Sequence, residues 1–434
     1  MRGRLAPLAV WPFSRLLSSY TLNELGDSVG VVALAVLVYD RTHAVAATAA
    51  FFIAAKFLPA LLAPVMTARL DQVPLRRSLP SIYVAEALVF GALAILAHDD
   101  FVLALVLALG LVDGTLAITA RGLTRGAVGS VLGPARLLKE GNALMNMGFA
   151  LASVGGAALA GLIVSELGLA TALLADAASF LAIAVVLGVT PGLPRMEATD
   201  GEERESWLVR LRAGLSFARS HQSVRLLLGG QAVALVLFTL VIPIEVIYAK
   251  ASLGTSDAGF GVLLASWGAG IVIGSLIYLA VRNRGVLALI LVSTGAIGVG
   301  YLGMATAGTL LVACAFSVLG GAGNGIQWIA VMTALQEATP RDFQARITGL
   351  LESLGAAMPG LGYLLGGVLA SLGSPRTAYA VAGGGVLALV LAALACHSRL
   401  PSGAAALATP RPRAVDMPLP EPLSPAPSAG PERH

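Results

Sequence analysis

The sequence has little charge for its length. Its 434 residues contain only 12% Asp, Glu, Lys and Arg, whereas 57% are hydrophobic. A soluble domain carries about 25% charged residues. Because charge is costly in hydrocarbon, a bilayer explains this deficit better than a large soluble core does. The composition therefore predicts an integral membrane protein.

Residues that commonly build chemical sites are also scarce. The two cysteines, Cys314 and Cys396, lie inside apolar runs, and the five histidines show no metal-ligand spacing. We therefore predict neither a disulfide, nor a metal site, nor a cofactor. The sequence has no Gly-x-x-x-x-Gly-Lys-[Ser/Thr] loop, which argues against an ATP-driven pump. It also has no constellation of nucleophile, base and metal, so we do not expect an enzyme.

Long apolar runs are abundant. A transmembrane helix needs about 20 mainly apolar residues. The runs are too long for strands, and they lack the alternation of a membrane barrel. They predict an all-α membrane protein with twelve transmembrane helices, at 14–39, 45–67, 79–97, 101–121, 143–165, 169–189, 225–249, 258–281, 286–305, 309–333, 347–372 and 376–396.

The positions of the basic residues predict the topology. With the N-terminus in the cytoplasm, the outer loops hold only Arg41, Lys250 and Arg376, and Lys56 lies within a span. The remaining Lys and Arg residues fall at inner ends and loops. The positive-inside rule then places both termini in the cytoplasm. Arginine outnumbers lysine 25 to 3, which suggests a GC-rich bacterial genome and hence a multi-pass protein of a bacterial inner (cytoplasmic) membrane.

The spans divide the chain into five parts. We predict a cytoplasmic N-terminus at 1–13, a six-helix bundle at 14–189, a cytoplasmic linker at 190–224, a second six-helix bundle at 225–398, and a disordered Pro-rich tail at 399–434. Within the linker, apolar and basic residues from Trp207 to Arg219 predict an amphipathic helix on the inner membrane face. A connecting role and a binding role are both open for that helix.

The two halves contain similar features at matched places. Tyr39 closes span one and Tyr248 closes span seven. Pro134-Ala135-Arg136 follows span four, and Pro340-Arg341-Asp342 follows span ten. The offset between matched features stays near roughly 204–209 residues. Two six-helix bundles related by an axis along the membrane normal produce this pattern.

Several motifs carry a family resemblance over about residues 12–398. The most specific are Leu25-Gly26-Asp27, Glu140-Gly141-Asn142-Ala143-Leu144, Gly259-Phe260-Gly261, and Gln336-Glu337-Ala338-Thr339-Pro340 leading to Arg346. In these residues the chain resembles the major facilitator superfamily, and within it the branch of enterobactin exporters and macrolide-efflux proteins. The resemblance implies two rocking six-helix bundles and proton-driven export of small molecules.

Two motifs of that superfamily occur in altered form. The segment 71–77 resembles the Asp-Arg-x-Gly-Arg-Arg motif of loop two but departs from it at Gln72, Pro74 and Leu75. By resemblance, its acid docks on a helix of the other half when the inner side is closed. The predicted gating residues are Asp71, Arg76, Arg77 and Arg346.

The second motif resembles the antiporter motif of span five, with Ala157 in place of its proline. Its glycines, Gly155, Gly156 and Gly161, permit close helix contact at the seam between the bundles. Tight packing and a hinge are both open for them.

Ionisable residues inside spans are candidates for transport. Glu24 and Asp27 lie three residues apart on one face of span one, and Lys56 should lie at similar depth in span two. We predict a carboxylate–lysine cluster. Either it is a proton-sensitive switch, in which protonation of a carboxylate releases the lysine, or it is a static ion pair.

The expected roles of the other ionisable residues depend on the span in which each one lies. Asp113, midway down span four, is a candidate proton or cationic-substrate site, or else makes a cross-helix hydrogen bond to Ser or Asn. Arg121, at the inner end of that span, could bind an anionic substrate, pair with an acid, or serve as a topology anchor. The remaining coupling or substrate candidates are Glu245 and Glu352, and we expect Glu86 and Asp176 to serve packing.

Together these features predict a secondary active transporter that exports a drug, siderophore or natural product by alternating access. An importer of the same fold and a non-transporting, receptor-like membrane protein are the alternatives. The predicted partners are a small-molecule substrate, protons and the lipid bilayer, with no nucleic acid, and we expect a monomer.

Overall fold

The structure is a computed structural model that describes residues 2–70, 73–98, 101–133, 135, 137–190, 193, 207–281 and 283–398. Every element within these ranges is helical, and twelve of the helices are long and apolar enough to cross a membrane. The predicted fold class is therefore confirmed. The predicted disordered tail, 399–434, lies outside the described residues.

The first six spans follow a short 3₁₀ helix, η1 (Arg2–Ala9). Span two is continuous in space but changes helix type midway through a π-helical segment. The elements of this half are α1 (Trp11–Thr42), α2 (Val45–Phe52), η2 (Ile53–Phe57), α3 (Leu58–Leu70), α4 (Leu75–His98), α5 (Leu103–Leu132), α6 (Leu138–Leu167) and α7 (Leu169–Gly188). Gly168, with φ +85°, makes the turn from α6 to α7, where an L side chain would be strained.

The second half begins with the linker helix α8 (Trp207–Ser220). Span seven is broken near Pro243, which lacks an N–H to continue the helical hydrogen bonds. The elements that follow are α9 (Gln222–Thr239), η3 (Ile242–Ile244), α10 (Glu245–Ile247), η4 (Tyr248–Ser252), α11 (Asp257–Val281), α12 (Val286–Thr306), α13 (Leu310–Ala338), α14 (Arg341–Leu372) and α15 (Pro375–Ser398).

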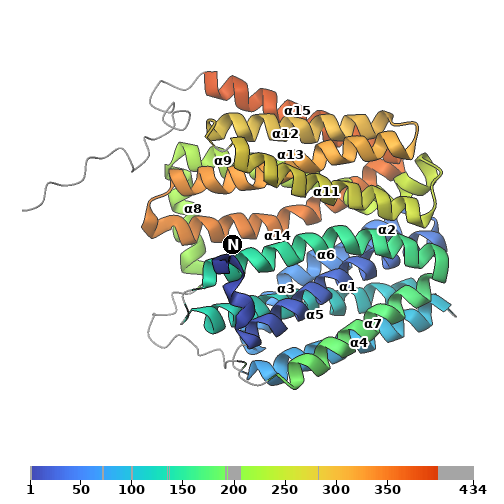
Figure 1. The fold of residues 1–434 in the computed structure, drawn as a ribbon. Coiled ribbons are helices and arrows are strands. Elements are labelled where there is room, and N and C mark those ends of the chain that lie inside the picture. The colour runs from blue at the N-terminus through green and yellow to red at the C-terminus, as the bar shows by residue number, and fades with distance from the viewer. Residues whose placement is uncertain are drawn as a thin grey trace, which may run out of the picture.

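The helices form two bundles that lie side by side (Figure 1). Between the bundles, α6 packs against α11, and span two packs against α14. We call the end that carries Asp40 and Lys250 the outer end, after the predicted topology, and the opposite end the inner end. The first part of span two, α2 and η2, contacts α14 more extensively than α3 does. The bundles are therefore closest at the outer end.

The predicted amphipathic linker helix is present as α8, and it packs on protein. Phe217 and Ala218 are buried in a cluster with residues of α9, α13 and α14. The Phe217 ring stacks on Phe343 at 4.5 Å between centroids. The helix therefore does not rest on the membrane face alone, as predicted, because the second bundle covers part of its apolar face.

Span four is longer than predicted. The sequence analysis ended it at Arg121, but α5 continues to Leu132. Arg121 therefore lies in the helix interior rather than at its inner end. The charge did not end the helix because it finds acidic partners on α1.

Candidate functional site

A buried ion pair joins α5 to α1 inside the first bundle. The Arg121 Nε atom lies 2.6 Å from Glu24 Oε1, and its Nη2 donates to Oε2 at 2.8 Å. The Glu24 side chain is 3% exposed and that of Arg121 35%. This two-point contact suits the planar guanidinium and carboxylate. Of the roles open for Arg121, pairing with an acid is the one that the structure contains.

Asp27 extends this pair into a cluster. Because it follows Glu24 by three residues on a helix, it lies on the same face. Its Oδ2 atom lies 3.7 Å from Arg121 Nη2 and accepts a hydrogen bond from Asn23 Nδ2 at 3.2 Å. Its Oδ1 atom is buried without a hydrogen-bond partner among the described residues. We call Asn23, Glu24, Asp27 and Arg121 the acidic cluster.

Asp113 lies on the same helix as Arg121, about two turns nearer the outer end. It is buried, at 8% exposure, and its Oδ1 has no hydrogen-bond partner in the described structure. Because α5 runs from Leu103 to Leu132, Asp113 lies nearer its outer end than the predicted position midway along the span.

Lys56 is not the partner that the sequence analysis expected. Its side chain is exposed, and within the described residues no ion pair joins it to Glu24 or Asp27. Arg121 takes that position instead, since its forked guanidinium can reach both carboxylates at once. Lys56 lies in the π-helical segment η2 of span two.

Glu86 and Asp176 lie behind α1, on α4 and α7. Glu86 is fully buried, and neither of its carboxylate oxygens has a hydrogen-bond partner among the described residues. The carboxylate of Asp176 lies against the backbone of Gly26 and Gly30, where any side chain on α1 would collide with it. Their burial between α1, α4 and α7 agrees with the packing position expected for them.

Glu245 and Glu352 do not join the acidic cluster. Glu245 opens the short α10 in the broken span seven and is half-buried. Glu352 lies on α14 and is exposed. In the part of the chain that the structure describes, neither side chain has a hydrogen bond or ion pair to the cluster.

The predicted gating residues are only partly described. Asp71 lies outside the described residues. Arg76 is exposed and donates from Nε to the Gly188 carbonyl at 3.0 Å, within its own bundle, and Arg77 is exposed nearby. The Arg346 guanidinium lies over the Phe343 ring at 5.3 Å, beside α8. Their role in gating stays a prediction.

The outer end holds a charged contact that the sequence analysis missed. Lys250 Nζ lies 2.6 Å and 2.7 Å from the two carboxylate oxygens of Asp40, and 2.6 Å from Asp257 Oδ1. Asp40 belongs to α1, whereas Lys250 and Asp257 belong to the second half. We call these three residues the outer ion pairs. The available signal was opposite charge at the matched ends of spans one and seven.

The three span-five glycines have different neighbours. A Cβ atom at Gly161 would lie 3.0 Å from the Cα of Gly261 on α11, across the seam. At Gly156 it would lie 2.5 Å from Cβ of Ser28, within the first bundle, and at Gly155 it would find no atom closer than 4.0 Å. Only Gly161 makes a close approach between the bundles.

Two bundles of six membrane helices, with a charged cluster within one bundle and the Asp40–Lys250 ion pair across their seam, fit a membrane transporter of the major facilitator type. The model of the transmembrane secretion effector family matches residues 2–427. The chain therefore belongs to that family, within the major facilitator superfamily. No curated protein matches the sequence.

Solved transporters share this fold at low sequence identity. The nucleoside transporter NupG superposes with a TM-score of 0.72 and 12% identity, covering 89% of this chain and 99% of its own. A POT family transporter in complex with 5-aminolevulinic acid gives 0.67 and 12%, covering 88% and 95%. A bacterial homolog of the lysosomal transporter Spinster, inward-facing and unoccupied, gives 0.62 and 14%, covering 91% and 96%. These similarities show that the chain shares the fold of these transporters.

Proposed function

We propose that the protein is a proton-coupled secondary transporter that exports a small molecule by alternating access, with the acidic cluster as its proton-sensitive centre. The observation that carries this proposal is the buried contact of Arg121 with both Glu24 and Asp27. Two carboxylates and one guanidinium inside a membrane span leave one excess negative charge in hydrocarbon, which a single proton would neutralise.

The coupling follows from the strength of this contact. With both carboxylates ionised, Arg121 ties α5 to α1 by one charge-assisted hydrogen bond to Glu24 and by ion pairs with Glu24 and Asp27. Protonation of Asp27 or Glu24 weakens that tie and frees the guanidinium to contact an anionic or hydrogen-bonding substrate group. One proton crossing 100 mV of membrane potential supplies about 2.3 kcal/mol. One or two protons per cycle therefore drive an appreciable substrate gradient.

The packing of the bundles supports an inward-facing arrangement. Span two meets α14 mainly through its outer part, and the Asp40–Lys250 ion pair crosses the seam at the same end. Substrate would then enter from the inner side and leave after the bundles rock. The name of the family, transmembrane secretion effector, favours export, as does the motif resemblance to enterobactin exporters and macrolide-efflux proteins. Import is the second candidate, favoured by the likeness to a nucleoside transporter.

Drug accumulation in an efflux-deficient bacterium tests the proposal. Cells expressing the wild type and Asp27→Asn are compared over a broad compound panel, with and without a protonophore, at equal membrane expression. We expect the wild type to lower accumulation of at least one compound, and both the protonophore and Asp27→Asn to abolish the effect. Glu166→Gln, which removes an exposed carboxylate at the outer end of α6 and outside the cluster, is the matched control and should export normally.

The outcomes separate the parts of the proposal. Normal export by Asp27→Asn that still stops with protonophore would keep proton-driven export and remove Asp27 as the coupling site, leaving Asp113 as the next residue to test. Export that persists with protonophore would rule out proton coupling. Accumulation above that of empty cells would show import instead.

A further inference from the structure

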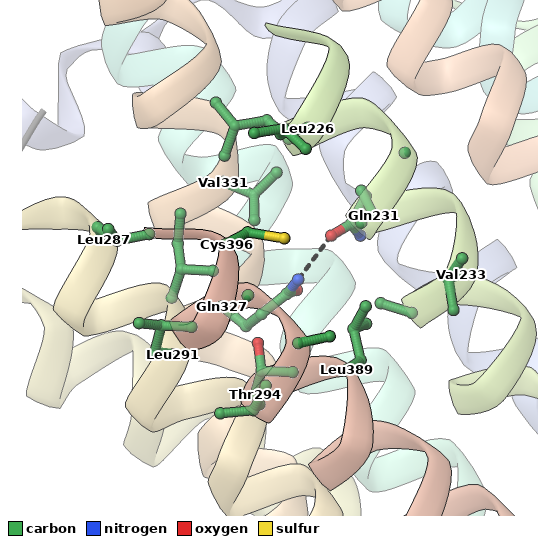
Figure 2. A pocket seen from close by; sticks show the side chains of 18 of the residues that line it. Leu226, Gln231, Val233, Leu287, Leu291, Thr294, Gln327, Val331, Leu389 and Cys396 are labelled. Carbon is green, nitrogen blue, oxygen red and sulfur yellow. Dashed lines mark hydrogen bonds between the residues drawn. The ribbon is translucent and has the colours of Figure 1, made fainter. Parts of the chain in front are cut away.

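The second bundle contains an apolar cavity at its inner half, between α9, α12, α13 and α15. Its volume is about 340 Å³, within the usual range for small-molecule sites of ~300–1,000 Å³. Figure 2 shows the side chains of Leu287, Leu291, Val331 and Leu389 around it. In Figure 1, α12 and α15 lie on the side of the second bundle that faces away from the first. The cavity is therefore separate from the acidic cluster.

Two glutamines place polar groups in this apolar cavity. Gln327 Nε2 donates to Gln231 Oε1 at 2.6 Å, and both side chains are buried, at 2% and 3% exposure. The two amides carry four N–H bonds between them, and their mutual hydrogen bond uses one. The Gln231 Nε2 group has no hydrogen-bond partner among the described residues. Leaving a buried donor unpaired costs free energy, so the cavity is suited to a ligand with an acceptor.

The position of the amides argues against a phospholipid as the occupant. Gln231 lies eight residues beyond Ser223, which lines the cavity near the inner end of α9. At 1.5 Å per residue, the amide is about 12 Å further into the bilayer. Phospholipid ester groups stay at the interface, and an acyl chain carries no acceptor at that depth. An acyl chain would fill the cavity and leave Gln231 unpaired.

We propose that this cavity is a binding site for a small lipophilic molecule with a carbonyl oxygen, taken up from the inner leaflet of the bilayer. The carbonyl accepts from Gln231 Nε2, and the hydrocarbon part packs against the leucine and valine side chains of α9, α12 and α15. Exposed positions on α9, Leu226 at 44% and Val233 at 49%, leave the cavity rim open toward lipid. The site does not depend on the proposed direction or coupling of transport.

Benzophenone tests the site directly, because it is a lipophilic ketone that cross-links to nearby C–H bonds on irradiation. The full-length protein in phosphatidylcholine vesicles is labelled over a concentration series, and the labelled peptides are mapped by mass spectrometry. We expect saturable labelling of cavity residues on α9, α12 and α15. Diphenylmethane, which has the same two rings but no carbonyl, should compete about tenfold less well.

Four variants complete the test. The double variant Gln231→Leu with Gln327→Leu removes both amides together, and it should raise the half-saturating benzophenone concentration about tenfold. Leu291→Trp fills the cavity and should abolish saturable labelling; if it does not fold, Ala393→Phe fills the cavity from α15. Leu391→Trp, on α15 with 66% exposure and outside the cavity lining, is the control and should label normally.

Two results would overturn the proposal. Labelling that is non-saturable, or spread over lipid-facing helices and insensitive to Leu291→Trp, would show that no site exists. Equal competition by diphenylmethane, together with unchanged labelling of the double glutamine variant, would show a cavity that takes hydrocarbon without recognising a carbonyl.

Discussion

Arg121 is the residue on which the acidic cluster depends, since its guanidinium contacts both carboxylates of α1. Glu24 is almost wholly buried, so its charge has little access to water when Arg121 is removed. Breaking a buried ion pair on one side is far more costly than replacing both partners by neutral groups. The stability of the protein should therefore respond very differently to single and double substitutions.

We predict that Arg121→Gln destabilises the purified protein by roughly 3 kcal/mol, near the low end for a buried pair because Arg121 keeps 35% exposure. Glu24→Gln combined with Arg121→Gln should recover most of that loss. Thermal unfolding in detergent measures both effects. Arg125→Gln is the control: one turn away on α5, Arg125 donates to the Tyr20 hydroxyl at 3.1 Å, and its loss should cost about 1 kcal/mol. Equal losses for Arg121→Gln and the double variant would contradict the pairing.

Glu86 offers a second prediction at this scale. Its carboxyl group is buried without a hydrogen-bond partner in the described structure, where an ionised group would be costly. Glu86→Gln, a neutral side chain of the same shape, should change unfolding by less than about 1 kcal/mol and keep transport, whereas Glu86→Lys should prevent folding. Transport and thermal unfolding are measured together. Loss of transport in a stable Glu86→Gln protein would place Glu86 on the proton route instead of in packing.

At the scale of elements, the sequence correctly predicted the structural features that a single run of residues determines. Twelve apolar runs of membrane length predicted twelve spans because hydrocarbon requires long helices with internal hydrogen bonds. The end of span four at Arg121 was wrong, because hydropathy treats a charge as a boundary and cannot see the acids on α1 that accept it. The direct ion pair predicted for Lys56 was wrong for a related reason: depth along a helix does not give the distance between charged groups on neighbouring helices.

Gly161 and Gly155 make a matched pair of span-five sites. A side chain at Gly161 would press on the backbone of α11 across the seam, whereas Gly155 has space. We predict that Gly161→Val separates the outer ends of the bundles, while Gly155→Ala leaves them together. Spin labels at Leu167 and Leu372, exposed positions at the outer ends of the two bundles, report the separation in a protein lacking Cys314 and Cys396. An unchanged distance in Gly161→Val would show that the seam does not need this contact.

At the scale of the whole molecule, the two halves are held together at the outer end by polar as well as apolar contacts. Lys250 belongs to the second half and bonds Asp40 of the first, 210 positions away. No local pattern in the sequence could predict this contact, because it forms only when the two bundles are docked. Asp257, on α11 beside the close approach of Gly161, shares the same ammonium group. In the proposed alternating-access cycle, we therefore expect the Asp40–Lys250 pair to exist in one state and to break when the outer side opens.

Removing a charge at the outer end should shift the balance between the inward-open and outward-open states by a small amount, and the amount should differ between the two residues. Asp40 is 44% exposed, so its pair with Lys250 contributes at most about 1 kcal/mol, and Asp40→Asn should raise the outward-open population up to about fivefold. Lys250→Gln should raise it further, because it also leaves Asp40 and Asp257 as neighbouring like charges.

The spin labels at Leu167 and Leu372 measure both populations, and 1 M salt should reduce the differences by screening. Arg41→Gln is the control, since Arg41 bonds the Ala97 carbonyl within its own bundle. If Lys250→Gln left the distance distribution like that of the wild type, the outer ion pairs would be a surface contact with no part in selecting the state.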